Sequence, residues 1–126
     1  MAAHILIADN DEKSLTGLGT LLTDLGYAVT LARTLDEALA AAARQAPAVA
    51  IVALSLAGDD PGTIVRALRA ATPAPSSMPQ APMLIALAGW GESRHRDAAL
   101  AAGFDVHLVR PVGLDQLMLI LSMTGQ

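Results

Sequence analysis

The stretch that decides the fold is Pro47–Gly62, which reads PAVAIVALSLAGDDPG. It opens with an unbroken apolar run, Ala48–Leu54, and closes with the turn-forming cluster Gly58–Gly62. An apolar run of this length between turn residues is typical of a strand that is buried on both faces of a parallel sheet. We therefore predict that the run is the central strand and that its carboxyl end faces the functional crevice.

Further strands and helices alternate on both sides of this central strand. Strands are expected at Ile5–Ala8, Ala28–Leu31, Met83–Leu87 and Val106–Val109. Helices are expected at Lys13–Leu25, Thr34–Gln45, Pro61–Ala71, Glu92–Ala102 and Gly113–Met123, with a proline-rich loop at 72–82. Such alternation requires right-handed crossovers. We predict a single α/β domain over residues 1–126, a flavodoxin-like (βα)5 doubly wound parallel sheet with strand order 2-1-3-4-5.

Local signals mark the start of the second helix and the ends of the first and fourth helices. Thr34 followed by Glu37 is the pattern of a capping box, in which the threonine begins the second helix. Gly26 and Gly103 stand directly after the first and fourth helices, where glycine is the usual terminator. We expect both helices to end at these glycines.

The composition narrows the class of function. The net charge of -4 at pH 7 lacks the basic excess that nucleic-acid binding usually needs. The absence of cysteine excludes disulfides, thiolate catalysis and cysteine-based zinc sites. Because the first apolar run is short and no basic residue precedes it, we expect neither a signal peptide nor a membrane span. We expect a cytoplasmic protein with no nucleic-acid or membrane partner.

The carboxyl ends of parallel strands meet at one edge of the sheet, so the residues there form the candidate site. They are Asp9, Asn10 and Asp11 after the first strand, Ala53 in the third, Ala88 and Gly89 after the fourth, and Arg110 after the fifth. Carboxylates close to the start of a helix are also favoured by the helix dipole. Two interpretations of Asp9, Asn10 and Asp11 therefore remain: a capped start of the first helix and a residual metal site.

The chain resembles the receiver domain of two-component response regulators over essentially its whole length. The similar segments are ILIADNDEK, IVALSLAGDDPG, LIALAGWG and AGFDVHLVRPV, which follow one another in this order. The resemblance implies a domain that takes a phosphoryl group from a histidine kinase onto its own aspartate. An acidic pair holding Mg²⁺, a Ser or Thr hydroxyl and a lysine would surround that group, because phosphoryl transfer depends on positioning and charge neutralisation.

The resemblance also implies which residues fill these positions here. Ala53 stands at the phosphoacceptor position, Ala88 at the hydroxyl position and Arg110 at the lysine position. A methyl group neither attacks phosphorus nor binds magnesium. Of the acidic pair, Asp9 remains and its neighbour is the neutral Asn10. We therefore expect weak or absent Mg²⁺ binding and no other cofactor.

Two further expectations concern side chains at the rim of this site. With one carboxylate missing, Arg110 is expected to reach into the vacated space and pair with Asp9. Asp11 would lie nearby. His107 stands where the family often carries a side chain that swings between inward and outward positions, although a half-exposed histidine in an edge strand is the simpler interpretation.

We interpret the chain as a pseudo-receiver, a non-enzymatic signalling domain that acts by protein-protein contact without aspartyl phosphorylation. One alternative is an active receiver with a non-standard acceptor, Asp59 or Asp60. Another is a flavodoxin-like domain that binds a small anion through Arg110. The resemblance places partner docking on the last two helices and the fifth strand, where apolar residues are plentiful: Ala98, Ala99, Leu117, Met118, Leu119, Ile120, Leu121 and Met123. A histidine kinase, the rest of a longer hybrid protein or a second copy is the expected partner.

Overall fold

The fold is a five-stranded parallel sheet with helices on both faces. The computed structural model describes residues 4–44, 47–57, 61–71, 83–89, 96–109 and 113–122. The strands are β1 (His4–Ala8), β2 (Ala28–Ala32), β3 (Val49–Ala53), β4 (Met83–Ala88) and β5 (Val106–Val109). Their order is β2-β1-β3-β4-β5, and every neighbouring pair is parallel. The predicted flavodoxin-like α/β architecture is confirmed.

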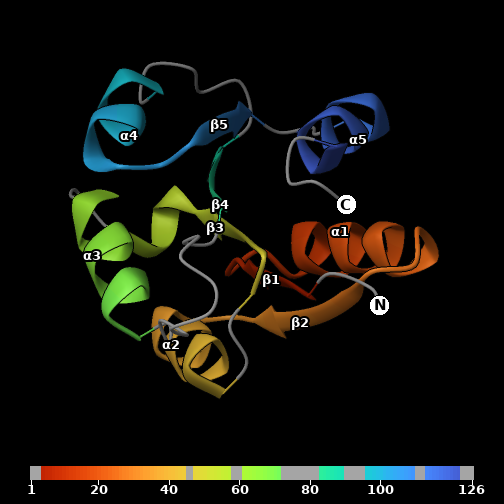
Figure 1. The fold of residues 1–126 in the computed structure, drawn as a ribbon, viewed down its shortest axis with the longest axis horizontal. Coiled ribbons are helices and arrows are strands. Elements are labelled where there is room, and N and C mark those ends of the chain that lie inside the picture. Colours follow the sequence, from red (N-terminus) through yellow and green to blue (C-terminus); the bar gives the residue numbers. More distant parts are fainter. Residues whose placement is uncertain are drawn as a thin grey trace.

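The helices divide into two layers, as Figure 1 shows. They are α1 (Glu12–Asp24), α2 (Leu35–Arg44), α3 (Pro61–Ala71), α4 (Arg96–Ala102) and α5 (Leu114–Ser122), with a short 3-10 helix η1 (Leu54–Ala57). One apolar core lies between the sheet and α2, α3 and α4, and the other between the sheet and α1 and α5. Among the described residues, no helix has the length and apolar character that crossing a bilayer requires.

β3 is the buried centre of the sheet, as the apolar run predicts. All five of its residues are buried, and it pairs with β1 on one side and β4 on the other. The predicted strand was too long at its carboxyl end, because Leu54 begins η1 instead of extending the ladder. This turn directs the chain from the sheet edge towards α3. The predicted fourth strand was one residue too short, because β4 continues past Leu87 and ends at Ala88.

Glycine ends two helices in the predicted places. Gly26 follows α1 with a φ of 98°, and Gly103 follows α4 with a φ of 118°. A side chain in this region of φ is strained, which explains glycine at both turns. The surroundings of the two glycines differ. A Cβ at Gly103 would lie 2.9 Å from Cγ1 of Val65, whereas a Cβ at Gly26 would have no described atom within 4 Å beyond its chain neighbours.

Several expectations fall outside the described residues. They are the loop at 72–82, the beginning of the fourth helix before Arg96, the end of the second helix at Gln45 and the end of the last helix at Met123.

The two turn glycines predict a graded loss of stability. Gly26→Ala introduces backbone strain alone and is expected to lower the free energy of unfolding by about 1 kcal/mol. Gly103→Ala adds a collision with Val65 and is expected to cost about 2 kcal/mol or more. Urea denaturation of the two variants checks the order. Equal losses would contradict the close packing of α4 on α3.

Candidate functional site

Asp9 and Ala53 lie side by side at the carboxyl edge of the sheet. Ala8 of β1 is paired with Val52 of β3. Asp9 is the next residue after Ala8, and Ala53 is the next after Val52. Both have no exposed surface, and Ala88 at the end of β4 is 1% exposed. The position beside the buried aspartate is thus filled by a methyl group. A second methyl group ends the neighbouring strand.

The acidic turn after β1 is organised by its own backbone. The N–H of Asp11 donates to Oδ1 of Asp9 over 2.9 Å. Asp11 is the N-cap of α1, and its carboxylate accepts from the N–H of Lys13 at 3.2 Å and from the Ser14 hydroxyl at 3.3 Å. For Asp11, the interpretation as a capped helix entry is confirmed.

Asn10 is linked to the segment that follows β3. The hydroxyl of Ser55, in η1, donates to Oδ1 of Asn10 over 3.1 Å, and both residues are exposed. Sequence reasoning assigned no role to Ser55. Its signal was its position, since it follows a strand that neighbours the one preceding Asn10. The amide oxygen that would otherwise be available to a cation is therefore engaged by a hydroxyl.

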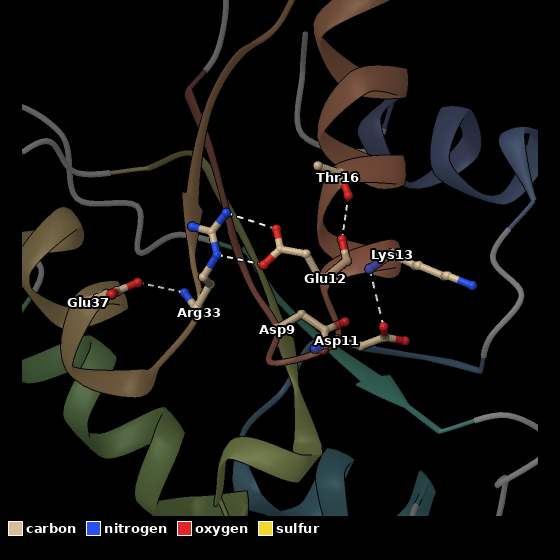
Figure 2. Close-up of polar contacts among 7 residues, drawn as sticks. All are labelled: Asp9, Asp11, Glu12, Lys13, Thr16, Arg33 and Glu37. Carbon is tan, nitrogen blue, oxygen red and sulfur yellow. Dashed lines mark hydrogen bonds and ion pairs between the residues drawn. The ribbon is translucent and has the colours of Figure 1, made fainter.

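A bidentate ion pair joins α1 to the end of β2. Arg33 donates from Nε and Nη2 to the two carboxylate oxygens of Glu12 at 2.7 and 2.8 Å, as Figure 2 shows. The N–H of Arg33 donates to Oε1 of Glu37 at 2.7 Å. The N–H of Glu37 donates to the hydroxyl of Thr34 at 3.1 Å, which confirms that arm of the capping box. Glu37 therefore reaches the residue before the N-cap, a small departure from the predicted pattern.

The ion pair changes the acidity of Glu12. The hydrogen bonds from Arg33, assisted by its charge, lower the pKa of Glu12 below its ordinary value of 4.5. The same interaction raises the pKa of Arg33. Sequence reasoning missed this pair, although both residues follow neighbouring strands at the same edge. One carboxylate of the acidic segment thus has a fixed cationic partner from the protein itself.

Of the remaining predicted site residues, one lies in a part of the chain that the structure describes and three do not. His107 is half-buried in β5, an edge strand, where it is paired with Ala86. Arg110, Asp59 and Asp60 lie outside the described residues, so the Arg110–Asp9 pair stays a prediction. Within the described ranges, no group of three or more His, Cys, Asp or Glu side chains is arranged to hold a metal ion.

Comparison with known families identifies the architecture. The family model of the response regulator receiver domain matches residues 5–122. The chain belongs to the response regulator receiver domain family. It is therefore a receiver domain of the two-component signalling type. No curated protein sequence matches the chain at a significant level.

Solved receiver structures resemble the whole chain. The receiver domain of the sensor histidine kinase PA1611 from Pseudomonas aeruginosa PAO1, described with a magnesium ion in its active-site cleft, is 26% identical, with full coverage of both chains and a TM-score of 0.79. A CheY-like receiver from Methanospirillum hungatei JF-1 is 23% identical, covers 99% of this chain and 95% of its own, and has a TM-score of 0.80. NtrX from Brucella abortus is 24% identical over 98% of this chain and 27% of its own, with a TM-score of 0.81.

The Glu12–Arg33 pair predicts a pH response of this receiver. Because the pKa of Glu12 is lowered on folding, the pair stabilises the fold above the ordinary carboxyl pKa and loses that effect as the pH falls through the lowered value. NMR titration of the Glu12 carboxyl carbon is expected to show its pKa rising in Arg33→Met. Arg33→Lys is expected to give an intermediate pKa, because it keeps the charge without the planar fork. An identical Glu12 pKa in the wild type and in Arg33→Met would contradict the ion pair.

Proposed function

We propose that this receiver domain signals without aspartyl phosphorylation, as a non-enzymatic module that binds a protein partner. The observation that carries the proposal is the fully buried methyl group of Ala53 beside the fully buried Asp9. Attack on phosphorus needs a nucleophilic oxygen, and the Ala53 side chain has none. Ala88, buried at the end of β4, likewise offers no hydroxyl that would respond to a phosphoryl group.

The described residues fit Mg²⁺ poorly, which supports the same proposal. Magnesium binds through one or two carboxylates in a near-octahedral oxygen shell. Here Asp9 accepts from a backbone N–H, Asp11 caps α1 and Glu12 is paired with Arg33. The oxygen of Asn10 is neutral and already accepts from Ser55. We infer that the domain holds Mg²⁺ weakly or not at all and needs no other cofactor.

The proposed partner surface is the outer face of α5. Leu117 packs in the core and is 1% exposed, while Met118 is 52% and Leu119 is 67% exposed. Two residues turn a helix by about 200°, so Leu119 points away from the sheet. A large apolar side chain held out in water favours contact with another protein. A histidine kinase, the rest of a longer hybrid protein and a second copy each meet this requirement.

Phosphorylation is tested with acetyl phosphate and Mg²⁺, followed by intact-mass measurement. The wild-type chain is expected to gain no phosphoryl group, because no oxygen occupies the acceptor position. A stable gain would contradict the proposal. Peptide mapping of that product to Asp59 or Asp60 would then identify the non-standard acceptor.

Restoring the missing carboxylates provides the matched experiment. Ala53→Asp with Asn10→Asp is expected to be destabilised by about 2 kcal/mol or more without metal, because it adds charge beside a buried aspartate. Millimolar Mg²⁺ is expected to raise its melting temperature. Ala53→Asn with Asn10→Asp has nearly the same shape with one charge fewer, and is expected to respond less. A larger Mg²⁺ shift in the wild-type chain would contradict the proposed loss of the metal site.

The docking face is tested with Met118→Ser and Leu119→Ser together. The double variant is expected to lose binding to the phosphotransfer domain of a hybrid histidine kinase, measured by calorimetry. Its unfolding free energy should change by less than about 0.5 kcal/mol, because both side chains are exposed. Leu25→Ser, at a leucine 40% exposed after α1, is the matched control. Undiminished binding by the double variant would exclude this face as the kinase contact.

A further inference from the structure

The outer side of α1 carries a stripe of four exposed residues with a palindromic spacing. Lys13, Gly17, Thr20 and Asp24 are separated by four, three and four residues and are all exposed. Residues at this spacing lie on one side of an α-helix. Because the spacing reads the same in both directions, a second α1 laid antiparallel on the first matches it position by position.

The two ends of this α1 stripe carry opposite charges. Antiparallel pairing sets Lys13 of each chain against Asp24 of the other, and Gly17 against Thr20, twice each by symmetry. Among the described residues the salt bridge found is Glu12–Arg33, and neither Lys13 nor Asp24 forms one. Figure 2 shows the Lys13 side chain extending away from that pair. Both charges are thus available to a partner.

A groove lies beside the carboxyl-terminal half of the α1 stripe, on the side of β2. It is an open hollow of about 300 Å³, lined by Thr16, Gly19, Thr20, Thr23, Asp24, Val29 and Leu31. Val29 and Leu31 are only half-buried, since β2 is an edge strand and α1 leaves them partly uncovered. Thr20 and Asp24 belong to both the groove and the stripe. A helix lying on the stripe would therefore border this groove.

Small side chains allow such a helix to come close. Apart from the backbone of α1 itself, no atom of the described residues lies within 4 Å of the place that a Cβ of Gly17 would occupy. The stripe therefore has an open backbone surface at its middle and charges at its ends. The α5 surface differs, because its described exposed residues include the large apolar Met118 and Leu119.

We propose that a second copy of this chain docks its α1 antiparallel on this stripe and forms a symmetric dimer. The proposal is independent of whether the domain is phosphorylated. A helix of 13 residues spans about 20 Å, so the interface is small and the dimer is weak, with a dissociation constant on the order of 10 μM to 1 mM.

Charge reversal with sedimentation equilibrium tests the dimer up to about 1 mM chain. Lys13→Asp and Asp24→Lys are each expected to weaken it about 10-fold, because each turns two attractions into two repulsions. The double variant is expected to restore it. Both substitutions favour the dipole of α1, and restoration of the dimer in the double variant separates lost pairing from a folding defect. Gly17→Leu is expected to weaken the dimer while leaving the monomer folded, because space is open there.

Disulfide trapping tests the direction of pairing, and the chain has no cysteine of its own. The Lys13→Cys, Asp24→Cys double variant is expected to form a covalent dimer on mild oxidation. Lys13→Cys alone is expected not to, because antiparallel pairing holds the two copies of that residue about 16 Å apart along the helix.

Three results overturn the proposal. They are a monomer throughout the concentration range, a dimer that either reversal leaves intact, and a dimer that is abolished by Leu119→Ser. Efficient trapping by Lys13→Cys alone overturns the antiparallel arrangement. A gain of a phosphoryl group, which would contradict the proposed function, leaves all four readouts unchanged, so failure here is distinguishable from failure of the proposed function.

Discussion

The parallel pairing of β1 with β3 is the constraint on which the site depends. It brings the residue after each strand to one buried point, and those residues are Asp9 and Ala53. Two carboxylates at such a point would repel each other at low dielectric and would need a cation. A methyl group in place of one removes that need. The apolar core fixes the sheet register. Because of this register, the side chain at position 53 strongly affects the net charge at the carboxyl edge.

The polar groups around this point are held by the protein's own contacts. Asp9 accepts from the turn after β1, Asn10 from Ser55 and Glu12 from Arg33. The Ser55 contact joins the segments that follow β3 and β1, and the Arg33 contact joins the segments that follow β2 and β1. In our account these bonds connect the loops that a metal ion would otherwise hold. We propose that these bonds favour one arrangement of the edge and that surfaces such as α5 carry the signal.

Much of the fold follows from local patterns. The apolar run at Val49–Ala53 needed only its composition to be recognised as the central strand, and Gly26 and Gly103 marked real helix ends. The contacts at the carboxyl edge were not predicted. Arg33 reaches Glu12 across 21 positions of sequence, and Ser55 reaches Asn10 across 45, and no local pattern encodes such distances. The end of β3 was misplaced because Leu54 is as apolar as the strand before it.

The central claim is that the carboxyl edge of this receiver accepts neither a metal ion nor a phosphoryl group. Amide NMR spectra recorded with Mg²⁺ and beryllium fluoride, a non-covalent mimic of a bound phosphoryl group, test it most directly. Our account predicts that the amide signals of Asp9, Asn10, Ala53 and Ala88 keep their positions at millimolar concentrations of both. Saturable shifts at these four residues that spread into β4 and β5 would contradict it.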